Sequence, residues 1–214
     1  MRSLAQANPV HPVNVHSLLI ATHNPHKTRE FAQILGTRYA VRDLTTSPAI
    51  PEVEETGASF AENAIIKANH ASNYSTDLVV ADDSGLVVDA LADAPGIFSA
   101  RYAGPEASDE ENRQKLLEEI ARARDDDMRF TARFRCVLAL SQDGKLLQTF
   151  EGVTEGTITR SPRGAAGFGY DPIFLPDGFE QTFAEIPPEV KNRISHRAQA
   201  IAQLAEYLAD HQTF

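Results

Sequence analysis

Short apolar runs alternate along this chain with segments whose apolar residues recur every three or four positions. The runs predict strands at Ser17–Thr22, Tyr39–Arg42, Leu78–Ala81, Leu86–Leu91, Phe130–Leu140 and Leu146–Thr157. The helical spacing predicts one helix that begins at Pro25 and three more at Ser59–Ser72, Asp109–Ala123 and Ser195–Asp210. Because Asp143-Gly144 is typical of a tight hairpin between the last two strands, we expect a mixed sheet in an α/β protein.

Residues that cap helices support these boundaries. Asn24 is a preferred N-cap, and Pro25 suits the first helical position. Ser59 and Glu62 have the spacing of a capping box, which gives Glu62 a structural role. The caps predicted for the other two helices are Asp109 and Ser195.

Size and composition fit one globular domain. The chain has 214 residues, of which 42% are hydrophobic and 23% charged, enough to build a core. We expect residues 17–214 to form this domain and residues 1–16, with prolines among polar residues and no apolar signal segment, to be a flexible extension. No apolar run reaches about 18 residues, so no transmembrane helix and no membrane partner are expected. The single cysteine, Cys136, excludes an internal disulfide and favours a cytoplasmic location.

The net charge of -10 limits the kinds of ligand that the protein is expected to bind. It argues against bulk nucleic acid, because the basic footprint that binds a phosphate backbone is missing. It does not exclude a small phosphate ligand, since a few local cations and a bound metal decide such a site.

The polar sequence Asp82-Asp83-Ser84-Gly85 directly follows the apolar run Leu78–Ala81. A strand that ends in two carboxylates and a hydroxyl places oxygen ligands at a sheet edge, where open α/β folds bind their ligands. Magnesium prefers such ligands. This stretch therefore predicts a magnesium-dependent phosphate site.

Two further segments supply charges for that site. Thr22, Asn24 and Lys27 surround a predicted helix N-terminus, which is suited to bind an anion; an ordinary capped helix with a surface lysine is the alternative. Glu54 and Glu55 lie in a loop and are free to bind a cation, with Lys67 on the helix that follows, although a solvated charged face is the simpler explanation. The acidic run at Asp125–Asp127 is better explained as a solvated linker than as a metal site.

A glycine-rich loop and a basic pair are candidates for binding a ring. Phe168 and Tyr170 lie among three glycines, where an aromatic side chain can stack on a base; a tight surface loop with its aromatic residues in the core is the alternative. His196 and Arg197 occupy the first turn of the last predicted helix, where cations oppose the helix dipole. An anion or an acceptor-rich ring bound near this end of the helix would explain why two basic residues occupy its first turn.

Five ordered motifs together resemble one family, the inosine triphosphate pyrophosphatases, or XTP/dITP diphosphohydrolases. The similarity extends from Leu18 to Leu208. The motifs are Thr22-His23-Asn24-Pro25-His26-Lys27 with Glu30-Phe31; Glu54-Glu55-Thr56-Gly57 with Ser59-Phe60, Glu62-Asn63-Ala64 and Lys67-Ala68; Ala81-Asp82-Asp83-Ser84-Gly85-Leu86 with Pro95-Gly96 and Ser99-Ala100-Arg101-Tyr102; Gly167-Phe168-Gly169-Tyr170-Asp171-Pro172; and Lys191 with Ile194-Ser195-His196-Arg197.

The resemblance implies a fold and a reaction. The fold is a long, mixed, twisted β-sheet flanked by helices, with two lobes, a central cleft and a homodimeric assembly. The reaction is the Mg2+-dependent hydrolysis of a deaminated purine nucleoside triphosphate (ITP, dITP or XTP) to the monophosphate and pyrophosphate, which cleanses the nucleotide pool.

The resemblance also implies roles for single residues. Asp83 is the implied general base, and the implied metal ligands are Glu54 and Asp83, with Asp82 and Glu55 as further candidates. The implied substrate-binding residues are Thr22, His23, Asn24, Pro25, His26, Lys27, Lys67, Ser84, Phe168, Gly169, Tyr170, Asp171, Lys191, His196 and Arg197. His23 and His26 stand where glycine is common in this family, which would narrow the phosphate loop.

Chemistry separates some of the possible substrates. Donors from His196 and Arg197 near O6 favour a 6-oxo purine over adenine, because an amino group there would leave polar groups unpaired. This argument does not explain how guanine is rejected. Two alternatives stay open: a pyrophosphatase for modified pyrimidines or a standard base, and a nucleotide sensor or RNA-binding module without hydrolysis.

Overall fold

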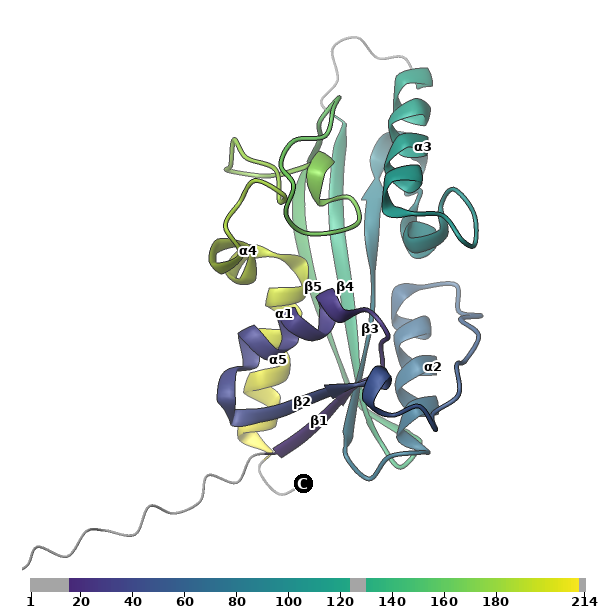
Figure 1. Ribbon diagram of the computed structural model, residues 1–214, viewed down its shortest axis with the longest axis vertical. Helices are drawn as coiled ribbons and strands as arrows, with labels where there is room; N and C mark the ends of the chain where they lie inside the picture. The colour runs from purple at the N-terminus through teal and green to yellow at the C-terminus, as the bar shows by residue number, and fades with distance from the viewer. Residues whose placement is uncertain (1–15, 124–129, 212–214) are drawn as a thin grey trace, which may run out of the picture.

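The computed structural model describes residues 16–123 and 130–211. The predictions for residues 1–15 and for Asp125–Asp127 lie outside this part of the chain. Six strands form one sheet in the order β2-β1-β3-β4-β5-β6 (Figure 1). The strands are β1 (His16–Ile20), β2 (Tyr39–Asp43), β3 (Leu78–Val88), β4 (Thr131–Gln142), β5 (Lys145–Ile158) and β6 (Phe174–Pro176).

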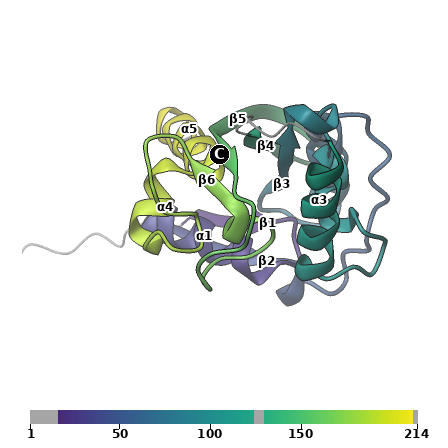
Figure 2. The same ribbon diagram turned by 90° about the horizontal axis from the view of Figure 1, so that it is seen from above.

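Helices group at the two ends of the long strands β3, β4 and β5 (Figure 1). The helices are α1 (Pro25–Leu35), α2 (Phe60–Ser72), α3 (Asp109–Arg122), α4 (Pro188–Ile194) and α5 (His196–Asp210). One end carries β1, β2, α1 and α2, and the other carries α3 and β6 (Figure 1). Seen from above, α3 lies on one side of the molecule and α4 and α5 lie on the other (Figure 2). Within the described residues, no helix combines the length and the apolar character that crossing a membrane requires.

The sheet is mixed, as predicted. β1 pairs in parallel with β2 and β3, whereas the β3–β4, β4–β5 and β5–β6 pairs are antiparallel. β1 ends its pairing with β3 at Ile20 and Val80, and the chain then turns into α1. β3 continues for eight more residues, from Ala81 to Val88. The edge of β3 that does not pair with β1 therefore begins next to Asp82 and Asp83.

The prediction of two short strands separated by a turn at Asp82–Gly85 was wrong. β3 runs without interruption because β4 pairs with it throughout, with Asp82 opposite Leu138 and Ser84 opposite Cys136. Gly85 permits a close approach on this strand, since a Cβ there would lie 2.4 Å from the carbonyl oxygen of Gly96. The 3-10 helix Gly96–Arg101 packs against the strand at that point.

Most local boundaries agree with the sequence, and two caps differ. The Asp143-Gly144 hairpin is present, with both residues at positive φ. Ser59 accepts the Glu62 N–H, but the Glu62 carboxylate accepts from Ala58 rather than from Ser59, so the predicted capping box is only half formed. Asp109 is the first residue of α3 and not its cap. Ser108 caps α3. Its hydroxyl accepts from the Glu111 N–H, and the Glu111 carboxylate accepts from the Ser108 N–H.

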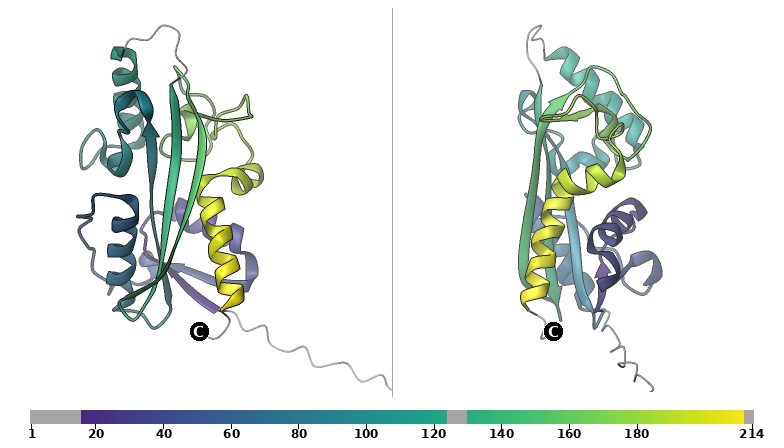
Figure 3. Two further views of the ribbon diagram at one scale, coloured as in Figure 1. Left: turned by 180° about the vertical axis from the view of Figure 1, so that it is seen from behind. Right: turned by 90° about the vertical axis from the view of Figure 1, so that its left-hand side faces the viewer.

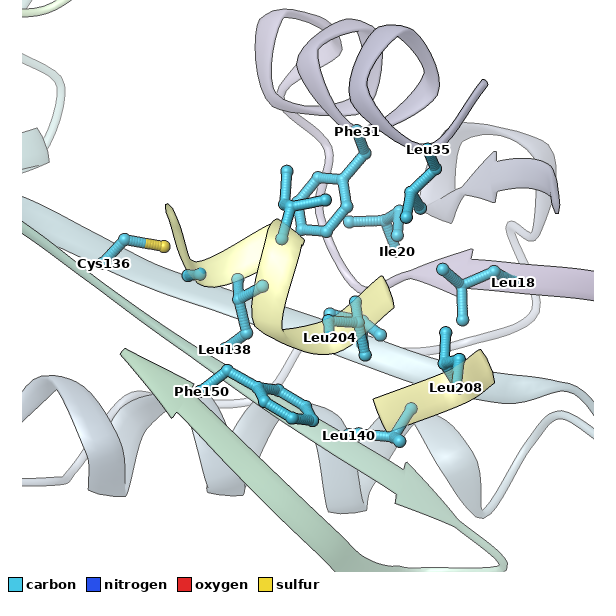
Figure 4. Packing of buried hydrophobic residues seen from close by; sticks show 13 residues of the cluster. Leu18, Ile20, Phe31, Leu35, Cys136, Leu138, Leu140, Phe150, Leu204 and Leu208 are labelled. Atoms are coloured by element: carbon cyan, nitrogen blue, oxygen red, sulfur yellow. The ribbon is translucent and has the colours of Figure 1, made fainter. Parts of the chain in front are cut away.

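Alternation along the strands divides the core between the two faces of the sheet. Val80, Leu138 and Leu140 face α1 and α5, which pack on that side (Figures 3 and 4). Val79 and Ala139 face α2. A third cluster lies further along the same strands, and it contains Leu86, Phe134, Tyr170, Phe174 and Phe183. Asp82 and Ser84 share the face of Val80 and Leu86 by their even spacing, so they form a polar interruption between two apolar clusters.

Candidate active site

Two adjoining cavities lie where β1 ends and β3 continues. The larger has a volume of about 600 Å³ and the smaller of about 130 Å³. They share Asn24, Lys27, Ser84 and Ala100 in their walls, so they form one cleft. The predicted residues in the larger cavity are Thr22, His23, Asn24, Lys27, Glu54, Glu55, Lys67, Asp82, Asp83 and Ser84. Those in the smaller are Asn24, Lys27, Ser84, Phe168, Gly169, Tyr170, Asp171, Lys191, His196 and Arg197. The predicted residues Pro25 and His26 line neither cavity.

The start of α1 forms one wall of the larger cavity. Asn24 caps the helix by accepting the His26 N–H at 2.9 Å, and its own N–H donates to the Thr22 hydroxyl at 3.1 Å. Lys27 reaches from the first turn into the cavity, and its Nζ lies 2.6 Å from Asp82 Oδ1. The positive end of the helix dipole and this lysine give the wall the character of an anion site.

Asp83 has one occupied and one unoccupied carboxylate oxygen. Its Oδ1 accepts from Lys67 Nζ at 2.8 Å, whereas Oδ2 is buried and has no hydrogen-bond partner among the described residues. Burial raises the pKa of the Asp83 carboxyl, and the attraction of Lys67 does not cancel that effect. The side chain therefore combines an available lone pair with an increased affinity for a proton.

Lys67 links Asp83 to the loop that precedes α2. Its Nζ lies 2.9 Å from Glu55 Oε1, and Glu55 also contacts Arg101 at 3.4 Å. Although burial favours the neutral amine, the two carboxylates raise the pKa of Lys67. Contrary to the prediction, Glu55 is not free to bind a cation, because two basic side chains already hold it. Glu54 is exposed in the wall of the same cavity.

Asp82 is surrounded by donors on both oxygens. Oδ1 accepts from Lys27 at 2.6 Å and from Ser84 at 2.7 Å, and Oδ2 accepts from Arg197 Nε at 2.6 Å. Burial alone would raise its pKa, but Arg197 and Lys27 hold the pKa of this carboxyl well below its usual range. Asp82 is thus a permanent anion, and its contacts suit a structural role better than metal binding.

A chain of ion pairs continues from Asp82 through the smaller cavity. Arg197 Nη1 contacts Glu30 at 2.6 Å, and Lys191 Nζ contacts Glu30 at 3.2 Å and Asp171 at 2.7 Å. This network explains the basic residues at the start of α5, since the protein itself supplies the anions that they face. Sequence reasoning gave Glu30 no role. Its position three residues after Lys27, on the same turn of α1, was the available sign.

Phe168 and Tyr170 have different environments. The Phe168 ring is partly exposed, and it stacks with His26 at 5.2 Å between centroids and 22° between planes. Lys191 Nζ lies 5.2 Å from its centroid. Tyr170 is buried, and its hydroxyl donates to the Ser99 carbonyl at 2.9 Å. Both side chains line the smaller cavity, Phe168 partly exposed and Tyr170 buried.

His196 and Arg197 differ in what they can still bind. Arg197 donates through Nε, Nη1 and Nη2 to Asp82, Glu30 and Ser84, so each of its nitrogens already has a protein acceptor. His196 stacks on Phe134 at 4.7 Å, and its Nδ1 is buried with no partner in the described part of the chain. Burial and the charge of Arg197 lower the pKa of His196 well below its usual range, so its ring is neutral.

The carboxylates of the larger cavity suit a cation that brings other ligands with it. Among the described residues, no group of three or more His, Cys, Asp or Glu side chains is arranged to hold a metal. Magnesium is commonly held by one or two carboxylates, waters and substrate phosphates. The unpartnered Asp83 Oδ2 and the exposed Glu54 carboxylate in the same wall fit this second pattern.

Comparisons with known proteins identify relatives over nearly the whole chain. The model of the Ham1 family matches residues 18–207. The chain is 48% identical to a dITP/XTP pyrophosphatase of Bacillus licheniformis, covering 89% of this chain and 97% of the relative. It is 47% identical to a dITP/XTP pyrophosphatase of Bacillus subtilis, covering 89% and 96%.

Solved structures support the same relationship. A HAM1 protein from Coxiella burnetii is similar with a TM-score of 0.81 and 44% identity, covering 92% of this chain and all of that protein. The Staphylococcus aureus Ham1 protein gives a TM-score of 0.79 and 40% identity, covering 91% and 98%. The predicted mixed α/β fold is confirmed by this similarity.

Proposed function

Because this chain belongs to the Ham1 family, we propose that it is a pyrophosphatase that hydrolyses dITP, ITP and XTP to the nucleoside monophosphate and pyrophosphate. The curated relatives carry the name dITP/XTP pyrophosphatase. The observation that carries the proposal within this molecule is the buried, unpartnered Oδ2 of Asp83, in a cavity whose walls also hold Lys27 and Lys67.

The larger cavity binds the triphosphate in this proposal. The N-terminus of α1 and Lys27 receive phosphate oxygens, and Lys67 lies on the other side of Asp83. The bond that breaks joins the α-phosphorus to the oxygen that bridges to the β-phosphorus. Negative charge develops on the leaving pyrophosphate, and preorganised cations stabilise that charge in the transition state.

Asp83 is the proposed general base. A water molecule attacks the α-phosphorus and gives its proton to the Asp83 carboxylate, whose Oδ2 has no hydrogen-bond partner among the described residues. Lys67 holds Oδ1 and so fixes the orientation of the carboxylate. Burial raises the pKa of the Asp83 carboxyl, which makes its carboxylate a stronger base.

Asp83 and Glu54 are the proposed ligands of Mg2+. When bound, Mg2+ neutralises phosphate charge and orients the triphosphate. Glu55 is held by Lys67 and Arg101, and Asp82 is held by Lys27 and Arg197, so we assign both to the support of neighbouring side chains.

The smaller cavity binds the base in this proposal. Phe168 offers a ring face, and the neutral His196 offers a ring nitrogen without a protein partner. In the tautomer that carries the proton on Nδ1, this nitrogen donates to a 6-oxo purine, whereas adenine presents its own amino donor there. The homodimer and the cytoplasmic location remain predictions from the sequence.

A substrate panel with product analysis tests the function. The protein is incubated with Mg2+ and, separately, dITP, ITP, XTP, dGTP, dUTP and dTTP, and pyrophosphate and orthophosphate are measured. We expect pyrophosphate as the first product and faster turnover of the three deaminated purine nucleotides. Orthophosphate as the first product, or tight binding of ITP without turnover, would contradict the proposal.

A further inference from the structure

Helix α3 holds the loop of the smaller cavity at one residue, Gly169. The Gly169 N–H donates to Asp109 Oδ2 at 2.6 Å, and the Gly169 carbonyl accepts from Arg113 Nη1 at 2.6 Å. Both bonds are charge-assisted and short, which is typical of strong hydrogen bonds. Arg113 also contacts Glu110 at 2.5 Å. One residue of the loop is thus bound on both its donor and its acceptor side by the same helix.

The rest of the loop is organised without α3. The Phe168 N–H donates to Asp171 Oδ2 at 2.9 Å, and Lys191 holds the same oxygen at 2.7 Å. The position of Arg113 leaves its Nε buried and without a hydrogen-bond partner in the residues that the structure describes. An unpaired buried donor is unfavourable, so the two bonds that Arg113 does make are the reason for its placement.

The held residue forms part of the wall of the base pocket. Gly169 and Asp109 line the smaller cavity together with His196 and Arg197, whereas Arg113 does not line it. The two helices that supply this wall, α3 and α5, lie on different sides of the molecule (Figures 1 and 2). A base whose 6-oxo group faces α5 therefore turns another edge toward Gly169.

We propose that Arg113, together with Asp109, is a positioning pair that makes the pocket reject guanine. This proposal rests on the proposed function. Hypoxanthine and guanine share the 6-oxo group and differ by the 2-amino group, which brings two N–H donors. Gly169 lines the pocket, but the bond from Arg113, which lies outside it, directs the Gly169 carbonyl toward α3. A 2-amino group that enters the pocket therefore does not meet this acceptor, and an unpaired donor weakens binding by roughly tenfold or more.

The ratio of kcat/KM for dGTP to that for dITP tests the proposal. We expect Arg113→Met to raise this ratio about tenfold, chiefly through a lower KM for dGTP, because the loop carbonyl is released. Arg113→Lys keeps one donor for the carbonyl and should raise the ratio less. Inhibition by the product pyrophosphate should be unchanged, since neither residue lines the larger cavity. A general loosening of the fold would alter that inhibition as well.

The matched control is Arg122→Met on the same helix. Arg122 is exposed and pairs with Glu118 on the outer face of α3, so this variant should keep the wild-type ratio. A ratio within twofold of wild type for a folded Arg113→Met variant overturns the proposal. If that variant does not fold, Arg113→Lys and Asp109→Asn decide the same question. Wild-type protein that releases no pyrophosphate from dITP contradicts the proposed function, whereas normal dITP turnover with an unchanged ratio contradicts this inference alone.

Discussion

Asp82 and Asp83 are neighbours on β3, yet they belong to two regions of the cleft in which a buried carboxylate has different surroundings. Asp82 faces α1 and α5, where Lys27, Arg197 and Ser84 occupy its oxygens. Asp83 faces α2, where Lys67 donates to one of its oxygens and the other has no hydrogen-bond partner among the described residues. Because side chains alternate along a strand, adjacent residues reach opposite faces of the sheet.

The difference shows that burial alone does not decide how a carboxyl group titrates. Burial acts on both groups in the same direction. Two cations outweigh it at Asp82 and lower the pKa, whereas Lys67 is shared with Glu55 and does not outweigh it at Asp83, where the pKa is raised. The first region holds a neutralised carboxylate, and the second holds the carboxylate that we propose as the base.

The largest effect expected from this comparison is on turnover. Asp83→Asn removes the proposed base while keeping an oxygen for Lys67, and we expect kcat for dITP to fall more than about a hundredfold, the usual scale for a general base. Steady-state kinetics with pyrophosphate detection measure it. Asp89→Asn, a surface substitution beyond the end of the same strand, should leave the rate unchanged. A near-normal rate for Asp83→Asn would place the base elsewhere.

The next effect is on stability. Asp82→Asn leaves Arg197 and Lys27 without their shared anion in a buried position, and we expect the free energy of unfolding to fall by about 3–5 kcal/mol. Denaturant titration at neutral pH measures it. Asp77→Asn breaks the more exposed Arg42–Asp77 pair and should lower this free energy by no more than about 1 kcal/mol. An equal decrease in the free energy of unfolding of both variants would show that the buried Asp82 is no more important for stability than an exposed ion pair.

The smallest effect concerns the dependence of stability on pH. Arg197 and Lys191 lower the pKa of Glu30 below its ordinary value of 4.5, despite the opposing effect of burial. The stabilisation by Glu30 is therefore fully present above pH 4.5 and is lost as the pH falls through the lower pKa of the folded state. Glu30→Gln lacks this pH-dependent stabilisation, so below pH 4.5 its free energy of unfolding should fall less steeply than that of the wild type.

Denaturant titrations between about pH 3 and pH 7 compare the two proteins. Glu206→Gln, on the exposed face of α5, is the control and should show the wild-type dependence. An identical slope for Glu30→Gln and the wild type would show that Glu30 does not contribute in this way.

Local sequence was sufficient for several features that local contacts decide. The N-cap at Asn24, the cap at Ser195 and the Asp143-Gly144 hairpin depend on neighbours within a few residues, and the structure contains all three. The ordered motifs also named most residues of both cavities, because the side-chain chemistry of a phosphate and base site is visible in residue types.

Contacts between distant segments were beyond the reach of sequence reasoning. A run of Asp, Asp, Ser and Gly has the composition of a turn, and only its pairing with β4 keeps it extended. Asp109 resembles a helix cap, but Ser108 takes that role, which leaves the Asp109 carboxylate for a loop 60 residues further along the chain. Glu30 had no evident function until Arg197 and Lys191 were placed beside it.

By itself, the sequence determined most of the strands and helices, the family, and the residue types gathered at Asp82–Asp83, at Thr22–Lys27 and in the Phe168 loop. Only the tertiary structure decided which of the two aspartates carries an open oxygen and which is neutralised by cations. The physical reason is that the pKa and the free lone pairs of a buried carboxylate depend on the charges that surround it. At this site, those charges come from α1, α2 and α5, which meet only when the chain folds.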